Sequence, residues 1–270
     1  MAEHIDSIFV ADGDGFTATE LASGPWDPRA LHGGAPAALM TSAFERLEPG
    51  AELPIARLGF ELLRPVPPGP LSIATSILRP GRRVQELAGE LRCDGELICR
   101  ASALRVQPVP DGLPAPGPAG APRPAGEATM PGPQEGAPVR FALDDSARVS
   151  FAATAMEMRW LDDPGALGPG RVWMRLRHPL LPGEPASALA RLAATADFGN
   201  GIGAVLPFAD FLFINADLTI HLHRQPTGEW IGLDARTVLH GGGTGLAESV
   251  LHDLDGPVGR AFQTLVVQPR

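Results

Sequence analysis

The sequence predicts an α+β protein made of two similar halves, each with one helix followed by a meander of antiparallel strands. The order of strand, helix and four strands occurs at residues 7–106 and again at residues 152–267. The turns of the two meanders repeat at an offset of about 160 residues, so Gly69 corresponds to Gly228 and Arg100 to Arg260. We therefore expect two copies of one unit that pair about a pseudo-two-fold axis.

In the first half, residues 7–22 alternate loosely between apolar and polar and predict one or two strands. A helix is expected over residues 37–47, because Leu39, Ala43 and Leu47 recur at helical spacing and Pro36 suits a first turn. The following strands are predicted at residues 55–63, 71–78, 84–92 and 97–106, separated by turns rich in proline and glycine.

The composition changes over residues 108–138 to proline, glycine and alanine, which predicts a surface linker. We expect an N-terminal unit at 1–107, the linker at 108–138 and a C-terminal unit at 139–270. In the second half, strands are predicted at 152–160 and 170–177, and an alanine-rich helix over 185–197 that begins with Pro185 and ends before Gly199. The later strands are expected at 211–215, 217–224, 230–239, 246–253 and 258–267.

Composition and charge exclude several classes of protein. The chain of 270 residues is 44% hydrophobic and 20% charged, which is typical of a globular protein. Its net charge of −9, without a basic stripe, argues against nucleic acid as a partner. No apolar run reaches the roughly eighteen residues of a membrane span, and the first residues lack signal-peptide features. We expect a cytoplasmic protein in which Cys93 and Cys99 are buried free thiols, although they could face each other across a hairpin.

Two polar residues stand out in the second half. Asp197 lies in the last turn of the alanine-rich helix, where the macrodipole favours a cation over a carboxylate. Asn215 ends the strand-like run at 211–215, which is otherwise apolar. A carboxylate at a helix end is more often a solvated residue than a catalyst, so the position of Asp197 alone does not indicate function.

Other motifs extend over the whole chain. His32-Gly33-Gly34 opens the first helix, and residues 79–84, with the sequence RPGRRV, form the middle hairpin of the first meander. Together with the paired halves, these motifs resemble the double hotdog fold of type II (TesB-like) acyl-CoA thioesterases. The resemblance covers nearly the whole chain apart from the linker. It rests on the joint order of short motifs that would each be weak alone.

The resemblance implies a catalytic set. In that family an Asp at the end of the second helix activates a water, assisted by a Thr or Ser early in the next strand and a Gln in the last strand. By position these roles fall on Asp197, Asn215 and Gln263. Asn215 departs from the pattern, because an amide replaces the usual hydroxyl. An amide can still donate to and accept from a water.

The same residues suit thioester hydrolysis on chemical grounds. The reaction needs a positioned water, a general base and donors for the developing oxyanion. Asp197 would act as the base or orient the water, while Asn215 and Gln263 hold it. The N–H groups of Gly33 and Gly34 at a helix start suit an oxyanion or a phosphate. We therefore assign substrate binding to His32, Gly33 and Gly34, and we expect no metal and no cofactor.

Rival constellations have less support. His221, His223 and His240 lack a carboxylate or cysteine at metal-ligand spacing. The sequence has no Gly-x-Ser-x-Gly elbow and no Asp-x-Asn-Pro-x-His loop of hotdog hydratases. The glycine-rich residues 199–203 follow a helix instead of joining a strand to one, unlike a dinucleotide-binding loop.

Two function classes follow from these observations. The first is an acyl-CoA thioesterase acting on a small-molecule acyl-CoA, as a homo-oligomer. The second is a non-hydrolytic acyl-thioester-binding protein on the same scaffold, with Asn215 marking lost chemistry. The sequence favours the first, because it has both Asp197 and Gln263, but it specifies neither the acyl chain length nor the choice between CoA and a carrier protein.

Overall fold

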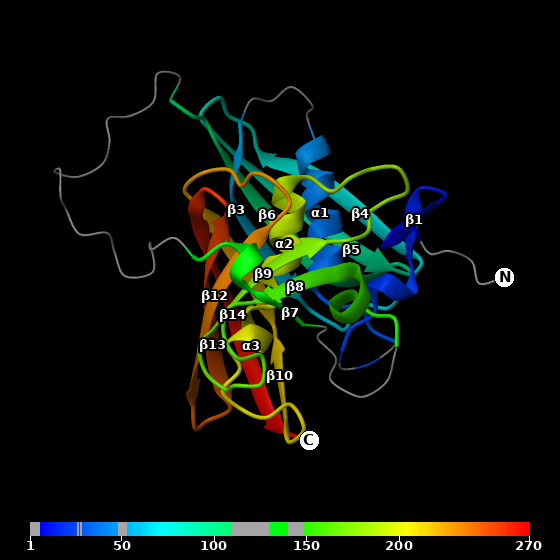
Figure 1. Cartoon of the computed structure of the whole chain (residues 1–270). Helices are drawn as coiled ribbons and strands as arrows, with labels where there is room; N and C mark the ends of the chain where they lie inside the picture. Colours follow the sequence, from blue (N-terminus) through cyan, green and yellow to red (C-terminus); the bar gives the residue numbers. More distant parts are fainter. Residues whose placement is uncertain (1–5, 26, 28, 48–52, 110–129, 140–147) are drawn as a thin grey trace.

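The computed structural model describes residues 6–25, 27, 29–47, 53–109, 130–139 and 148–270. In these residues two helices lie side by side and antiparallel strands curve around them (Figure 1). Each helix and the strands around it form one half of the molecule.

The first half follows the predicted order closely. Its strands end within a residue or so of the predicted turns, and its helix begins three residues earlier than expected. The elements are β1 (Phe9–Asp12), β2 (Gly15–Ala18), a 3-10 turn (Glu20–Ala22), α1 (Gly34–Arg46), β3 (Ile55–Leu62), β4 (Leu71–Arg79), β5 (Val84–Cys93) and β6 (Glu96–Val106).

The second half repeats this order with a longer connection after the second helix. The elements are a 3-10 turn (Pro133–Glu135), β7 (Ala137–Pro138), a π-helical turn (Phe151–Ala155), β8 (Met156–Trp160), β9 (Gly170–Leu176), α2 (Ala188–Ala196), α3 (Gly199–Ile202), β10 (Phe211–Asn215), β11 (Asp217–Leu222), β12 (Ile231–His240), β13 (Thr244–Asp253) and β14 (Gly256–Pro269).

One continuous sheet runs through both halves. The halves join where β3 pairs antiparallel with β11, with Leu58 opposite Ile220. From this seam the order outward is β6-β5-β4-β2-β1 on one side and β14-β13-β12-β9-β8-β7 on the other, while β10 pairs with β14. Corresponding strands therefore lie at equal distances from the seam. The predicted repeat is confirmed, and the fold is a double hotdog.

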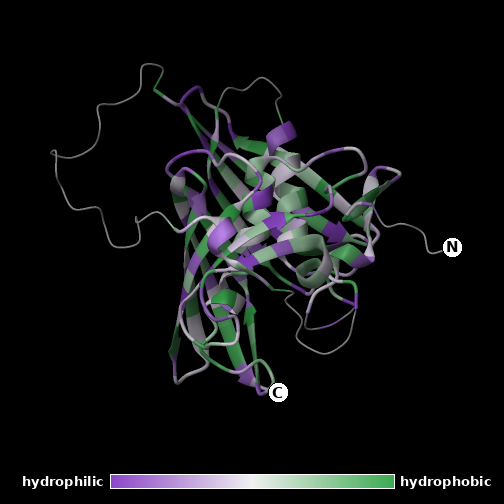
Figure 2. Ribbon diagram, in the orientation of Figure 1, coloured by the Kyte–Doolittle hydropathy of each residue, from purple (hydrophilic) through white to green (hydrophobic). Residues whose placement is uncertain are grey.

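The two helices pack closely because small residues line their contact. An ideal Cβ atom placed on Gly34 would lie 2.4 Å from the carbonyl oxygen of Ala194, so only glycine fits there. Ala190 and Ala193 of α2 are fully buried. Figure 2 shows apolar and neutral residues along the middle of α1, whereas its last turn, which contains Arg46, is hydrophilic.

The sequence predictions need two local corrections. Helix α2 begins at Ala188, not at Pro185, because the Ser187 side chain caps it by accepting from the backbone N–H of Ala190 at 2.9 Å. Residues 152–155, predicted as the start of a strand, belong instead to the π-helical turn at residues 151–155. The Ser150 hydroxyl accepts from the backbone N–H of Ala153 and so starts that turn.

The segment predicted as a linker lies largely outside the described residues. Its described end, residues 130–138, packs on the second half. The indole N–H of Trp173 donates to the Pro131 carbonyl at 2.6 Å, and β7 pairs with β8. The indole and the edge of β8 thus give the backbone of these few residues its partners. The domain boundaries themselves stay a prediction.

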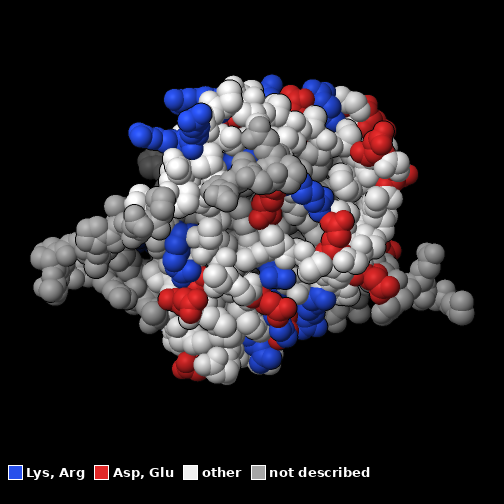
Figure 3. All heavy atoms as spheres, turned by 90° about the horizontal axis from the view of Figure 1, so that it is seen from above, with Lys and Arg blue, Asp and Glu red and all other residues white. Residues whose placement is uncertain are grey.

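Charge is interspersed over the surface. On the described part of the face in Figure 3, basic and acidic side chains alternate, apart from a group of basic ones at one edge (upper left). Many of these charges pair, as Arg236 does with Glu248 and Arg175 with Glu157. Within the described residues no helix has both the length and the apolar character needed to cross a bilayer.

Candidate active site

Asp197 lies where α2 ends. It is the C-terminal cap of the helix and is only 5% exposed, although its side chain is a carboxylate. The chain continues directly into the short helix α3, so Gly199-Asn200-Gly201, predicted as a helix stop and loop, instead adds another helical turn. Gly199 makes this possible, since a Cβ atom there would lie 2.6 Å from the Ser249 hydroxyl. A buried carboxylate at the negative end of a helix is costly, so its neighbours must stabilise it.

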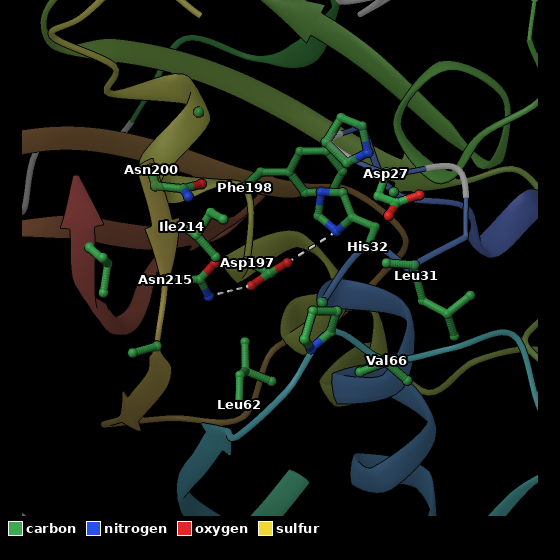
Figure 4. A pocket seen from close by; sticks show the side chains of 18 of the residues that line it. Asp27, Leu31, His32, Leu62, Val66, Asp197, Phe198, Asn200, Ile214 and Asn215 are labelled. Atoms are coloured by element: carbon green, nitrogen blue, oxygen red, sulfur yellow. Dashed lines mark hydrogen bonds and ion pairs between the residues drawn. The ribbon is translucent and has the colours of Figure 1, made fainter. Parts of the chain in front are cut away.

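Asn215 provides one of these neighbours. It ends β10, and its side-chain amide donates to Oδ1 of Asp197 at 2.8 Å (Figure 4). The same amide nitrogen also lies 3.3 Å from the carbonyl oxygen of Asp217. The amide that departs from the family pattern therefore contacts the carboxylate directly.

His32 provides the second neighbour, from the segment just before α1. Its Nδ1 lies 3.0 Å from Oδ2 of Asp197, and both residues are buried (Figure 4). The imidazole ring stacks on Phe198 with a centroid distance of 4.2 Å, and Phe151 lies 5.1 Å away. These rings hold the imidazole beside the carboxylate.

Gln263 lies behind the carboxylate, in β14, and is 1% exposed. Its amide donates to the backbone carbonyl of Asp197 at 3.1 Å, and its carbonyl accepts from the backbone N–H of Asn200 at 2.9 Å. Gln263 does not line the cavity described below. The residue thus joins the end of α2 to the start of α3 and is placed to position Asp197.

The two glycines after His32 have different surroundings. Gly33 lines the cavity, and a Cβ atom there would lie 2.8 Å from Oδ2 of Asp197. Gly34 packs against α2, and its backbone N–H lies 3.1 Å from Nδ1 of His32. The expectation that Gly34 contacts substrate is therefore corrected, because its close packing on Ala194 turns it away from the cavity. Gly33 keeps the predicted position.

A cavity of about 480 Å³ opens beside these residues, between the two halves. Most of its wall is apolar. The first half contributes Leu31, Leu62, Leu63, Pro65 and Val66, and the second half contributes Phe198, Ile202, Phe208, Ile214 and Val266. Apolar clefts with a few convergent polar groups are typical binding sites.

Charged groups occupy only a few places on the wall. They are Asp27, Arg64 and Asp197, with His32 as a further titratable group. The hydrogen bond from the Arg29 side chain lowers the pKa of Asp27, so that carboxylate is ionised at neutral pH. Arg64 pairs with Glu96 at 3.0 Å, and more than half of each side chain is exposed. Arg64 thus places a basic group at the exposed part of the cavity wall, away from the buried Asp197.

The arrangement can hold a water against a carboxylate inside an apolar cavity. The structure brings together Asp197, Asn215, His32 and Gly33 at the wall, with Gln263 directly behind. Sequence reasoning missed the contact between His32 and Asp197. It also missed Asn200, whose side-chain amide donates to the Phe213 carbonyl at 3.2 Å and so joins α3 to β10. A histidine directly before two glycines at a helix start was the available signal for the first contact.

The rival histidine set does not form a metal site. Among the described residues no group of three or more His, Cys, Asp or Glu side chains is placed to hold a metal ion. His221 is an exposed residue of β11, and His240 is exposed at the end of β12.

Two family models match the chain. The model of the acyl-CoA thioesterase N-terminal domain matches residues 22–106, and the model of the acyl-CoA thioesterase C-terminal domain matches residues 124–267. Together they span both halves. A search of curated protein sequences gave no match.

Several solved structures share the fold over almost their whole length. A candidate thioesterase from Novosphingobium aromaticivorans is 23% identical with a TM-score of 0.67, covering 96% of this chain and 98% of that one. A candidate thioesterase II from Thermobifida fusca is 18% identical with a TM-score of 0.74, covering 96% and 95%. The acyl-CoA thioesterase II TesB2 from Mycobacterium marinum is 18% identical with a TM-score of 0.65, covering 96% and 94%. At these identities the likeness shows the fold alone.

Proposed function

The chain belongs to the acyl-CoA thioesterase family, and from this premise we propose that it hydrolyses an acyl-CoA thioester to a free acid and CoA. The observation that carries the proposal is the buried Asp197 carboxylate on the wall of an apolar cavity, held by Asn215 and adjacent to His32. A structural carboxylate gains most from a cationic partner or from solvent, whereas this one faces a space that fits a ligand.

The cavity suits an acyl thioester in one orientation. The acyl chain would lie along the apolar wall between Leu62 and Val66 on one side and Phe208 and Ile214 on the other. The thioester would then lie next to Asp197. The CoA portion would extend past Arg64, the exposed cation of the wall, which suits a phosphate.

In this orientation a water beside Asp197 attacks the thioester carbonyl. Asp197 either takes the water proton or orients the group that takes it, and Asn215 fixes the carboxylate. The N–H of Gly33, which lines the cavity at the start of α1, would donate to the developing oxyanion. Gln263 keeps the Asp197 backbone in place, as its two hydrogen bonds indicate.

Three further proposals concern the compartment, the cofactor requirement and the oligomeric state of the enzyme. We place it in the cytoplasm, where Cys93 and Cys99 would stay reduced; both are buried free thiols, and burial raises the pKa of Cys99 to about 12. No cofactor is needed for the hydrolysis. We also propose a homo-oligomer, and light scattering that gives a 28.3 kDa monomer at micromolar concentration contradicts this.

The experiment measures thiol release from acyl-CoA substrates of short, medium and long chain by the wild-type protein. We expect hydrolysis of at least one of them. Calorimetry with a non-hydrolysable thioether analogue of the same acyl-CoA measures binding separately. Binding of the analogue without any thiol release would establish the non-hydrolytic acyl-thioester-binding protein instead, and absence of both binding and release overturns the assignment of substrate.

A further inference from the structure

The position of His32 goes beyond substrate binding. Its ring is 9% exposed and packs on both Phe198 and Phe151, which also stack on each other. It forms part of the cavity wall next to Asp197, and Figure 4 shows it beside that carboxylate and Phe198. A histidine fixed in this way presents one ring nitrogen to the carboxylate and leaves the other available for another partner.

Two groups compete for Nδ1 of this ring. The Gly34 N–H lies 3.1 Å away and would require an unprotonated nitrogen, whereas Oδ2 of Asp197 lies 3.0 Å away and would require a protonated one. An unprotonated Nδ1 would place its lone pair against a carboxylate oxygen inside a buried site, which is repulsive. A proton on Nδ1 leaves the N–H of the buried Gly34 without this acceptor, but the contact with a carboxylate outweighs that loss, because hydrogen bonds to a charged group are the stronger kind. The surroundings therefore favour the proton on Nδ1.

Asp197 is better placed to orient a base than to be one. Its Oδ1 accepts from Asn215 and its Oδ2 faces Nδ1 of His32, and a Cβ atom added to Gly33 would lie 2.8 Å from the same Oδ2. In contrast, within the described residues no protein group hydrogen-bonds to Nε2 of His32, and this ring forms part of the wall of the substrate cavity. A lone pair on Nε2 is therefore available to a water in the cavity.

We propose, on the premise that the protein hydrolyses acyl thioesters, that His32 is the catalytic base and that Asp197 holds it in the reactive tautomer. Nε2 takes a proton from the attacking water as the water oxygen bonds to the carbonyl carbon, and the carbonyl π electrons move to the oxygen. When the tetrahedral intermediate collapses, the C–S bond breaks and its electron pair goes to sulfur. The proton on Nε2 passes to that thiolate, which leaves as the free thiol of CoA.

This role predicts a pH dependence of the rate. Nε2 must carry a lone pair to act, so a base at this position makes kcat depend on pH, and a variant without the imidazole loses that dependence. The charged groups that face the ring or share its cavity are Asp197 from the end of α2, Asp27 from the segment before α1 and Arg64 after β3.

Two substitutions separate a base from a positioning residue. The amide nitrogen of His32→Asn mimics Nδ1 and can keep the contact with Asp197, whereas the amide of His32→Gln mimics Nε2. If His32 is the base, both variants lower kcat by about two orders of magnitude or more. Both should change KM little and lose this pH dependence of kcat. His221→Gln, at an exposed position of β11, is the matched control and keeps wild-type kinetics.

The contrary outcomes are distinct. A His32→Asn variant that keeps kcat within a few-fold of wild type shows that His32 only positions Asp197. Nitrogen-15 NMR of the histidine side chains in the full-length wild type tests the tautomer without any variant at position 32, and a proton found on Nε2 at neutral pH overturns the proposal. If the wild type hydrolyses no acyl-CoA, the proposed function fails and the role of base fails with it. Loss of hydrolysis in Asp197→Asn but not in the His32 variants refutes this inference alone.

Discussion

The two ends of the pair formed by α1 and α2 have similar geometry but differ in how the charge at the helix C-terminus is balanced. At one end, the start of α1 (His32) meets the end of α2 (Asp197). At the other, the start of α2 meets the end of α1, where the Ser187 hydroxyl donates to Glu45 at 2.7 Å. Each end thus has a carboxylate at a helix C-terminus that faces the N-terminus of the partner helix.

Basic side chains neutralise the negative end of the α1 dipole. Arg105, buried in β6, donates to the carbonyl oxygens of Phe44 and Leu47 at 2.8 and 2.6 Å, and Arg46 pairs with Glu184. The end of α2 has no basic residue in its last turn, and the neutral amide of Gln263 contacts its last carbonyl instead. The comparison indicates that basic side chains satisfy the dipole at one helix end, whereas the other end keeps a carboxylate beside a cavity with Asn215 and His32 as its neighbours. Such a charge costs stability, as expected of a functional site.

The largest expected effect separates the two carboxylates. Asp197→Asn should lower kcat for acyl-CoA hydrolysis by about two orders of magnitude or more, because the carboxylate that accepts or orients the water proton is lost. Glu45→Gln, at the opposite end, should leave kcat unchanged. Steady-state thiol release and circular dichroism on both variants provide the check. Equal rates for Asp197→Asn and wild type contradict the site.

A second comparison concerns the ends of β5 and β13, which correspond in the repeat. Arg92 lies at the end of β5, whereas His252 of β13 is 1% exposed and has no hydrogen-bond partner for either ring nitrogen among the described residues. Burial lowers the pKa of His252 to about 4. Because this folded-state pKa lies below the unfolded value, only the unfolded chain binds the proton between about pH 6.5 and 4.

The free energy of unfolding should therefore fall as the pH drops through this range, by up to about 3 kcal/mol. Urea unfolding at pH 7 and pH 4.5 measures the loss. In His252→Phe the part of the loss due to this group should be absent. An unchanged pH dependence in that variant shows that other groups are responsible.

Arg105 contacts the end of α1 and Gln263 contacts the end of α2. We expect Arg105 to support stability alone and Gln263 to support both stability and catalysis. Arg105→Met should lower the free energy of unfolding by about 2–3 kcal/mol, since two helix-end carbonyls lose a charged donor, and should leave kcat unchanged. Gln263→Leu should cost about 1–2 kcal/mol and also lower kcat by roughly tenfold, because Asp197 and Asn200 lose their shared support. Chemical denaturation and kinetics on both proteins measure the two effects. A Gln263→Leu enzyme with full kcat shows that the residue is purely structural.

The smallest expected effects distinguish the neighbouring glycines. Gly34→Ala should destabilise by about 1–3 kcal/mol, because its methyl group would overlap the Ala194 carbonyl. Gly33→Ala should mainly lower kcat, because its methyl group would press on the Asp197 carboxylate. Thermal unfolding and kinetics of the two variants are compared. The reverse pattern, with Gly33→Ala unstable and Gly34→Ala inactive but stable, contradicts the assignment of the glycines.

Sequence reasoning placed the strands well because their signals are local. Alternating side chains and the Pro-Gly or Asp-Gly turns fixed β3 to β6 and β11 to β14 within a few residues. It failed at residues 152–155, where alanines carry no alternation and the Ser150 cap decides the conformation. Helix α2 was extended too far toward its start because Pro185 was taken for the first position, when Ser187 caps the helix.

The sequence by itself determined the repeat, the double hotdog fold and the presence of Asp197, Asn215 and Gln263 in the second half. Tertiary structure alone decided that His32, from the other half, lies 3.0 Å from Asp197 and that Gln263 lies behind the carboxylate instead of at the cavity. The reason is physical. Periodicity and turn chemistry depend on neighbours along the chain, whereas the meeting of the two helix ends depends on how closely Gly34 and the alanines of α2 let the helices pack.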